Sequence, residues 1–428
     1  MTSVEAQPNE SSRVAMLSGC RVLDLTTERG LMCGQILGDL GADVIKVEPP
    51  GGSPVRSLKP FFADEPGPER SVYWWAYNRN KRGVTLDLET GEGRDLMRRL
   101  VARADFVLES DSPGALARIG LGYDDLSAIN PGLVYVSITP FGQDGPKASY
   151  ADSDLIVMAA SGVLILYGDE DRPPIRMSVP QAYLHACADA AGAALIAFYD
   201  RLNTGLGQQV DVAAQESVAL AAQSTLLAAT IGGDETRRMA GGVKMGPIRV
   251  PLVWEAKDGL VTCVFLFGSA LGVFTRKMMN YICEQGFCDQ ASRDKDWIAY
   301  GDLLLTGREP IEEYDRMKGV VANFLRSMTK AESFDLARQY GFLIAPLSTT
   351  DDLLANPQFI AREYWRTIED RELGVKLTYP GPFAQFGATP IEFKRRPPRV
   401  GEHNHEIYVG ELGLSEREFG DLARRGII

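Results

Sequence analysis

The first third of the chain alternates short apolar runs with segments in which apolar residues recur at helical spacing. The apolar runs have the length and composition of buried strands, and they lie at residues 21–25, 43–48, 83–88, 105–109 and 133–139. The segments between them predict helices at residues 31–40, 91–103 and 123–128. This alternation predicts an α/β fold with a parallel sheet, right-handed crossovers, and ligands bound beyond the carboxyl ends of the strands.

Beyond residue 150 the pattern changes. Two helices, the second long and alanine-rich, and one strand are predicted at residues 154–166, 182–203 and 209–212. From about residue 250 the pattern loosens, which indicates a second, smaller domain. Its predicted elements are a strand at 259–265 and helices at 296–305 and 311–328. Strand character then returns at residues 342–345, and a last helix is predicted at 416–425.

Composition narrows the possible partners and locations. The 57 acidic and 45 basic residues of this 428-residue chain give a net charge of −12, which disfavours nucleic acid, because phosphate binding needs a basic surface. The longest apolar run, Ala190–Tyr199, is too short to span a membrane. Residues 1–18 lack the apolar core of a signal peptide and predict a loose tail. We therefore expect a soluble, cytoplasmic protein with no membrane segment.

The cysteines and histidines argue against metal and histidine chemistry. The six cysteines form no CxxC pair, and Cys283 and Cys288 lack a second pair or a nearby histidine, so we expect reduced, mostly buried thiols. Of the three histidines, only His185 is available to a Ser/His/Asp triad, and its alanine-rich surroundings are typical of a core or interface residue. No metal site is expected.

A dinucleotide-binding unit is the first alternative that the opening strand–helix–strand pattern raises, with Glu48 as the acid that would bind the ribose. However, the turn Thr26-Thr-Glu-Arg-Gly30 lacks the G-x-G-x-x-G pattern, so the pyrophosphate cradle is missing and an NAD-dependent oxidoreductase is disfavoured. The helix that follows Gly30 still offers an anion site in principle. Asn80-Lys81-Arg82 brings two cations to a strand start, which spacing alone assigns to solvated surface charge.

Ordered motifs along nearly the whole chain, from about residue 19 to residue 428, resemble those of the class III CoA-transferases. This is the superfamily of formyl-CoA transferase, carnitine CoA-transferase and α-methylacyl-CoA racemase. The motifs include Leu23-Asp-Leu-Thr, the segment 40–48, Asn80-Lys-Arg, Gly120-Leu-Gly-Tyr, Phe141-Gly-Gln-Asp-Gly, Thr204-Gly-Leu-Gly-Gln and Gly401-Glu-His.

The resemblance implies an α/β architecture with a Rossmann-like large domain built from both chain ends and a smaller middle domain. Mapped onto this chain, the large domain covers residues 19–225 and 336–428, and the small domain with its linkers covers 226–335. The resemblance also implies two subunits that interlock like chain links. Coenzyme A and acyl-CoA are then substrates, and no cofactor is permanently bound.

The resemblance places coenzyme A across the large domain, near the first helix and the loop after the strand that ends at Glu109. Arg118 matches a family arginine near the CoA phosphates, and a guanidinium fork suits phosphate geometry. The other candidate CoA-binding residues are Glu28, Arg29, Leu86, Ser110 and Lys147. For these residues, generic surface charge is an equally good interpretation.

The family's nucleophile is missing from its expected position. In this family one aspartate near the start of the long middle helix attacks the acyl-CoA thioester, which gives a mixed anhydride and releases the CoA thiolate. Counting back from Thr204 places this position at Ala182 or Tyr183, and the surrounding segment contains no acid. The racemase branch uses the same aspartate, and its histidine and glutamine positions are Ser153 and Met158 in this chain.

Three explanations remain open. The first, which we prefer, is a non-catalytic subunit whose homologous partner supplies the aspartate in a heterodimer or heterotetramer. That arrangement is known in this family for succinyl-CoA:(R)-benzylsuccinate CoA-transferase of anaerobic toluene degradation. The second is a homodimeric transferase with a displaced nucleophile, Asp189 or Asp171. The third is a non-enzymatic homologue that binds acyl-CoA.

On the preferred explanation, the candidate donor is succinyl-CoA and the candidate acceptor is an aromatic succinate such as benzylsuccinate. Trp74, Trp75 and Tyr77 are aromatic residues that an acceptor pocket would use, although buried packing is the more common role of such side chains.

Overall fold

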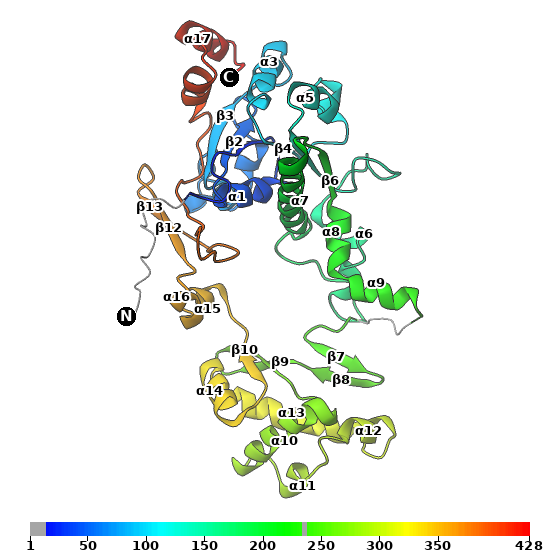
Figure 1. Ribbon diagram of the computed structural model, residues 1–428. Helices are drawn as coiled ribbons and strands as arrows, with labels where there is room; N and C mark the ends of the chain where they lie inside the picture. The colour runs from blue at the N-terminus through cyan, green and yellow to red at the C-terminus, as the bar shows by residue number, and fades with distance from the viewer. Residues whose placement is uncertain (1–13, 233–237) are drawn as a thin grey trace, which may run out of the picture. The chain divides into compact units, whose positions relative to one another are not determined.

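The computed structural model describes residues 14–232 and 238–428, which form two compact units (Figure 1). The first unit comprises the residues up to Leu164 together with Met177–Leu226 and Gln358–Ile428. The second comprises Ile165–Arg176 and Leu227–Pro357. The first unit therefore contains both chain ends, as the resemblance implied.

A six-stranded parallel sheet forms the centre of the first unit and confirms the predicted α/β fold. Its order is β3-β2-β1-β4-β5-β6, so the direction of strand addition reverses between β1 and β4. The strands are β1 (Arg21–Asp24), β2 (Asp43–Glu48), β3 (Lys81–Thr85), β4 (Phe106–Glu109), β5 (Val134–Thr139) and β6 (Gln209–Ala213). Nearly every residue of β1–β5 is buried, which explains why these strands read as continuous apolar runs in the sequence.

Helices cover both faces of this sheet. The helices of the first unit are α1 (Leu31–Asp39), α2 (Val72–Tyr77), α3 (Gly91–Val101), α4 (Ala115–Arg118), α5 (Tyr123–Ile129), α6 (Asp154–Ala160), α7 (Ala182–Thr204), α8 (Ala214–Ala221) and α17 (Glu416–Arg424). The residues of α9 (Gln223–Thr230) and α16 (Pro357–Ala361) are divided between the two units. Helix α6 ends at Ala160 instead of residue 166, because Gly162 takes a left-handed backbone conformation with φ of 79°.

The alanine-rich helix α7 is long and apolar enough, by length and composition alone, to cross a membrane. The sequence-based exclusion of such a segment counted uninterrupted apolar residues and did not detect it. In the structure α7 contacts α1 and β5, and its alanines at positions 186, 190, 194 and 197 are buried. A helix whose small residues pack closely on a sheet serves as a core element of the fold.

The C-terminal segment packs back onto the first unit. The His403 Nδ1 atom accepts a hydrogen bond of 3.1 Å from the Gly83 amide, and Tyr408 donates one of 2.8 Å to the Thr85 carbonyl. The Gly401-Glu-His motif therefore holds the chain end against β3. A hairpin of β12 (Arg366–Asp370) and β13 (Val375–Tyr379) precedes it, and a π-helical turn (Glu406–Glu411) leads to α17.

The second unit has an antiparallel sheet in the order β11-β10-β9, a hairpin and a layer of helices. Its elements are β7 (Gly242–Met245), β8 (Ile248–Pro251), β9 (Val253–Ala256), β10 (Gly259–Cys263), β11 (Ile344–Pro346), α10 (Gly268–Glu284), α11 (Gln290–Arg293), α12 (Tyr300–Leu305), α13 (Ile311–Arg326), α14 (Lys330–Tyr340) and α15 (Thr350–Leu354). Its core centres on Phe265, Trp297 and Tyr314, and the rings of Phe265 and Tyr314 stack at 5.6 Å.

Three details differ from expectation. Residues 336–357 lie in the second unit and not in the large domain, because β11 pairs with β10. Cys283, in the last turn of α10, forms a disulfide with Cys288, where reduced thiols were expected. The last residues of the predicted loose tail are fixed, because Leu17 is buried and its amide donates to the Leu40 carbonyl at 3.0 Å. Residues 1–13 of that tail lie outside the described part of the chain.

Candidate functional site

A buried ionic cluster lies where β1 ends, formed by one carboxylate and two ammonium groups. Asp24, Lys46 and Lys81 are each at most 1% exposed. The Lys81 Nζ atom lies 2.8 Å from one Asp24 oxygen, and the Lys46 Nζ atom lies 3.2 Å from the other. The assignment of Asn80-Lys81-Arg82 to surface charge was therefore wrong, since Arg82 is also buried and pairs with Asp43 at 2.6 Å.

This cluster joins three strands to the first helix. Lys81 also donates to the Leu31 carbonyl at 2.8 Å, and Lys46 donates to the Thr26 carbonyl at 2.5 Å. Burial alone would raise the pKa of Asp24, but the two ammonium groups more than offset this and lower it to about 2. Burial also lowers the pKa of Lys81. The cluster lies beneath the turn that connects β1 to α1, and it fixes that turn in place.

The turn after β1 is also held from the side by Ser110. The Thr27 amide donates to the Ser110 Oγ atom at 2.8 Å, and Arg29 donates to the Ser110 carbonyl at 3.3 Å. Ser110 follows β4, so this contact links the two strands between which the sheet order reverses. Glu28, at the tip of the turn, is exposed and has no ion pair or hydrogen bond among the described residues.

A cavity of about 490 Å³ opens between this turn and the N-terminus of α7. Residues from five segments line it: Glu28, Arg29, Leu31, Met32, Leu58, Lys59, Tyr73, Tyr77, Asp152, Ser153, Asp154, Val179, Pro180, Tyr183, Leu184 and Cys187. It lies at the carboxyl edge of the sheet, where ligands of doubly wound folds bind. We take it as the candidate functional site.

Tyr183, one of the two positions expected for the family nucleophile, lines the cavity, and its hydroxyl donates to the Asp152 carboxylate. Arg29 pairs with the same carboxylate at 2.5 Å, and the Asp152 side chain is 6% exposed. Burial and the Asp152 hydrogen bond both raise the pKa of Tyr183, so its phenol stays protonated. The Asp152 carboxylate is therefore bound by both Arg29 and Tyr183. The protonated phenol of Tyr183 cannot act as the nucleophile that a carboxylate would be.

The other aspartate of the cavity has a structural role. The Asp154 Oδ1 atom accepts hydrogen bonds from the amides of Gln181 at 2.6 Å and Ala182 at 2.8 Å, so it satisfies the N-terminus of α7. Ala182 is fully buried and does not line the cavity. The displaced-nucleophile candidates are elsewhere: Asp189 is exposed on α7 outside the cavity lining, and Asp171 belongs to the second unit.

The six candidate CoA-binding residues are distributed unevenly. Glu28 and Arg29 line the cavity, and Ser110 contacts their turn. Leu86 does not present its side chain to a ligand, because that side chain is 1% exposed within the apolar core of the first unit. Arg118 and Lys147 are exposed outside the cavity lining, and no hydrogen bond or ion pair of either side chain occurs in the described part of the chain.

Of the aromatic residues of α2, two are buried in the core and two line the cavity. Trp74 and Trp75 are buried against Leu31 and Val55, which confirms their packing role. Tyr77 lines the cavity together with Tyr73, which the sequence analysis missed. Lys59 and Asp152 were missed as well. Asp152 precedes Ser153, the family's histidine position, and that adjacency was the one sequence signal that pointed to it.

His185 is exposed in the single chain, so it is not a core residue, and the interface alternative stays a prediction. Within residues 14–232 and 238–428, no group of three or more His, Cys, Asp or Glu side chains is arranged to hold a metal ion.

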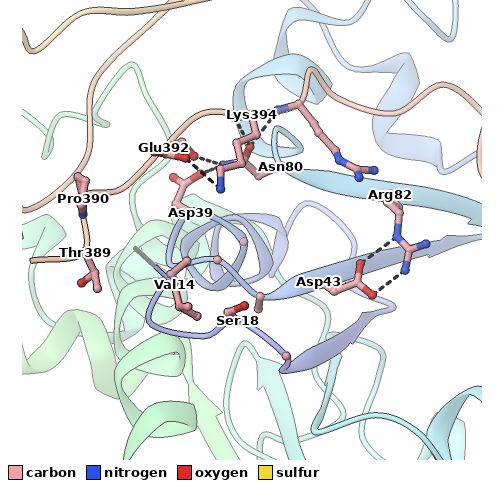
Figure 2. A pocket seen from close by; sticks show the side chains of 16 residues that line it. Val14, Ser18, Asp39, Asp43, Asn80, Arg82, Thr389, Pro390, Glu392 and Lys394 are labelled. Atoms are coloured by element: carbon pink, nitrogen blue, oxygen red, sulfur yellow. Dashed lines mark hydrogen bonds and ion pairs between the residues drawn. The ribbon is translucent and has the colours of Figure 1, made fainter. Parts of the chain in front are cut away.

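A larger cavity of about 520 Å³ lies at the amino edge of the sheet, where β1 and β2 begin (Figure 2). Several of its polar and charged side chains interact with one another. Arg82 binds Asp43, Asn80 donates to Asp39 at 2.8 Å, and Lys394 lies 2.9 Å from Glu392. Because this edge is the wrong one for a doubly wound fold, the cavity is the weaker candidate, although the Arg395 side chain that lines it has no hydrogen bond or ion pair among the described residues.

Glu109, at the carboxyl end of β4, faces a third cavity of about 270 Å³ lined also by Tyr123, Tyr135 and Gln143. The Glu109 carboxylate accepts a hydrogen bond of 2.8 Å from the Asp111 amide. Burial nevertheless raises the pKa of Glu109 to about 7, and the charges of Asp111 and Asp211 add to the effect.

Glu109→Gln is expected to change how stability depends on pH. Between about pH 4.5 and 7 the folded chain holds a proton on Glu109 that the unfolded chain releases, so stability falls as pH rises through this window. The glutamine variant lacks this penalty, and its stability relative to the parent should grow from pH 5 to pH 8 by up to about 3 kcal/mol. Urea unfolding at each pH measures the difference, and parallel pH profiles would contradict the raised pKa.

Comparison with known proteins identifies relatives along almost the full chain. The model of the family described as CoA-transferase family III matches residues 17–404. The chain is 37% identical to "Succinyl-CoA:(R)-benzylsuccinate CoA-transferase subunit BbsE" of Thauera aromatica, over 95% of this chain and 97% of that subunit. It is 32% identical to "Succinyl-CoA--D-citramalate CoA-transferase" of Chloroflexus aurantiacus, over 96% of this chain and 98% of that protein.

Solved structures agree with this similarity. The crystal structure of a CAIB/BAIF family protein from Brucella suis superposes with a TM-score of 0.79 and 28% identity, over 92% of this chain and 99% of that one. The shared fold spans both units.

Proposed function

The chain belongs to CoA-transferase family III, and on that premise we propose that it is the non-catalytic subunit of a heteromeric CoA-transferase. The supporting observation is that neither expected nucleophile position, Ala182 or Tyr183, holds an aspartate. Ala182 is fully buried, whereas Tyr183 lines the cavity, where its hydroxyl and Arg29 both bind the Asp152 carboxylate. The catalytic aspartate is then supplied by a homologous partner subunit.

The partner is supported by an exposed apolar stripe on α7. Ile196, Tyr199 and Leu202 follow one another at helical spacing, and each is between 67% and 73% exposed. Exposed apolar surface of this kind favours a protein interface. The relative from Thauera aromatica is itself a subunit by name. We propose an interlocked dimer, as heterodimer or heterotetramer, in the cytoplasm, without nucleic acid or membrane as partners.

The proposed reaction moves coenzyme A from an acyl-CoA donor to a carboxylic acid, with CoA thioesters as substrates and no resident cofactor. The names of two relatives support succinyl-CoA as donor, and one of them supports (R)-benzylsuccinate as acceptor. We propose that the reaction belongs to the anaerobic degradation of aromatic compounds. We propose that Arg118, Glu28, Arg29, Ser110 and Lys147 contact coenzyme A, with Arg118 at its phosphates.

Co-expression with an aspartate-bearing homologue tests the proposal. We expect the chain alone to give no hydroxylamine-trappable acyl-enzyme and no transfer, and the co-purified pair to transfer coenzyme A. Replacing the partner's aspartate should lower kcat at least about a thousandfold, because the nucleophile is lost. Asp189→Asn and Asp171→Asn in this chain should leave kcat unchanged. An adduct trapped on either residue in the isolated chain would overturn the proposal.

A further inference from the structure

The sheet register places a row of polar side chains across β4, β5 and β6. Glu109, at the end of β4, pairs with Ser137 on β5, and Ser137 pairs in turn with Asp211 on β6. Residues paired across neighbouring strands present their side chains to the same face of the sheet. Glu109 is 5% exposed and Ser137 is 1% exposed, so the row begins in the protein interior, at the cavity of about 270 Å³ that both residues line.

The lining of this cavity carries charge of one sign only. Asp124 and Asp125, in the first turn of α5, are exposed and add their carboxylates to that of Glu109. Among the described residues that line the cavity there is no lysine, arginine or histidine. Three carboxylates without a cation favour a positively charged ligand.

Two buried hydroxyls of the cavity are left without partners. The Ser137 Oγ atom is shielded from solvent and makes no hydrogen bond of good geometry. Tyr135, on the same face of β5, is 2% exposed, and its hydroxyl has no hydrogen bond with any described residue. Glu109 accepts from the Asp111 amide at 2.8 Å through Oε2, but its Oε1 atom has only a long contact of 3.4 Å with the Gln143 side chain. Buried polar groups are normally hydrogen-bonded, so these atoms indicate a ligand that supplies donors.

A primary ammonium group complements these atoms. It carries a positive charge and three N–H donors, and Glu109 Oε1 and the hydroxyls of Ser137 and Tyr135 are three acceptors. The rings of Tyr123 and Tyr135, with centroids 6.2 Å apart and planes at 61°, form an aromatic wall of the kind that attracts cations. In the part of the chain that the structure describes, no acidic group is arranged to hold a metal ion, which favours an organic cation.

We propose that this cavity binds the ammonium group of a small aliphatic amine. Glu109 neutralises the charge, Ser137 and Tyr135 accept from the remaining N–H groups, and Asp124 and Asp125 attract a second ammonium group when the ligand is a diamine. The cavity shares no lining residue with the cavity at α7. The amine site is therefore separate from the position of the nucleophile, and it does not depend on the proposed function.

Calorimetric titration of the full chain with 1,4-diaminobutane at pH 8 and low ionic strength tests the site. We expect saturable binding of about one diamine per chain. Glu109→Gln keeps the shape of the side chain but removes its charge, and should weaken binding about tenfold. Tyr135→Phe and Ser137→Ala should each weaken it about threefold. Glu216→Gln, which changes an exposed glutamate of α8 outside the cavity lining, is the matched control and should bind as the parent does.

The pH dependence of binding separates a contact with Glu109 from a merely structural role. Burial raises the pKa of Glu109 to about 7, and the charges of Asp111 and Asp211 add to the effect. The ammonium group binds the ionised carboxylate, so the affinity of the parent should rise about tenfold from pH 6 to pH 8, with release of a proton. Glu109→Gln should lack this rise. The melting temperature of each variant verifies that it is folded.

The absence of saturable binding would overturn the inference, as would equal affinity in the parent and the Glu109→Gln variant. 1,4-Butanediol has the same length without charge, and its binding as tightly as the diamine would show that the ammonium groups contribute nothing. Potassium chloride that displaces the diamine at equal concentration would also overturn the inference, because the site would then hold a metal ion. Each of these failures leaves the proposed function untouched, since that function concerns position 183 and the partner's aspartate.

Discussion

Asp24→Asn is expected to lower the free energy of unfolding by about 3–5 kcal/mol, because it leaves two buried ammonium groups without their counter-charge. Asparagine has the same shape as aspartate, so the change isolates the charge. Lys46 and Lys81 are at most 1% exposed and have no other carboxylate within ion-pair distance among the described residues. Urea unfolding of the parent and the variant at pH 7 measures the loss.

The pH dependence of the parent's stability provides a second test of the Asp24 cluster. The pKa of Asp24 in the folded chain, about 2, is below its ordinary value of 3.8, so its contribution to stability is complete above pH 4. That contribution is lost as pH falls toward 2. The variant should therefore lose less stability than the parent over this acid range.

Asp95→Asn is the matched control, since Asp95 pairs with Arg98 at 2.7 Å on the exposed face of α3 and the change should cost less than about 1 kcal/mol. Asp24→Asn/Lys81→Met should recover part of the loss by removing one unpaired ammonium group. A loss for Asp24→Asn as small as that of the control would contradict the buried cluster. It would also remove our explanation of how the turn after β1 is fixed.

The parallel sheet was predictable from the sequence, because both of its faces are covered and its strands are continuously apolar. The predicted strands 21–25, 43–48 and 133–139 correspond to β1, β2 and β5 within one residue at either end. The hairpin of β12 and β13 escaped prediction. Its residues alternate between exposed and partly buried environments, so polar side chains interrupt the apolar signal.

Side-chain environment was much harder to predict than fold. Lys81 was assigned to the surface because its burial depends on Asp24, which is 57 residues away in the chain. The cavity combines Lys59, Tyr73, Asp152 and Tyr183 from separate segments, and no local pattern brings them together. The family resemblance supplied the expected position of the nucleophile, but it left Ala182 and Tyr183 as equal alternatives.

Tyr183→Asp is expected to give this chain the reactive carboxylate that it lacks. The side chain at position 183 faces the cavity, whereas that of Ala182 is fully buried and faces the protein interior. In the family reaction the carboxylate attacks the thioester carbonyl, the carbon–sulfur bond breaks, and coenzyme A leaves as a thiolate. With succinyl-CoA we expect about one equivalent of free thiol per chain, where the parent releases none.

The neighbouring acids should make this reaction pH-dependent. A carboxylate at position 183 stands close to Asp152 and Glu28, and like charges raise its pKa. Thiol release should therefore be greater at pH 8 than at pH 5. Hydroxylamine trapping followed by peptide mass analysis should locate the acyl group at position 183.

Ala182→Asp is the matched control, with the same new side chain one residue away. Its carboxylate would be buried beside the Asp154 cap, so we expect a less stable protein that releases no thiol. The comparison decides between the two positions that the sequence left open. Thiol release by Ala182→Asp, and none by Tyr183→Asp, would make Tyr183 only a wall of the cavity. If neither variant reacts although both still bind the thioester, the cavity at α7 is not the family's nucleophile site, and the proposal that Tyr183 disables it fails.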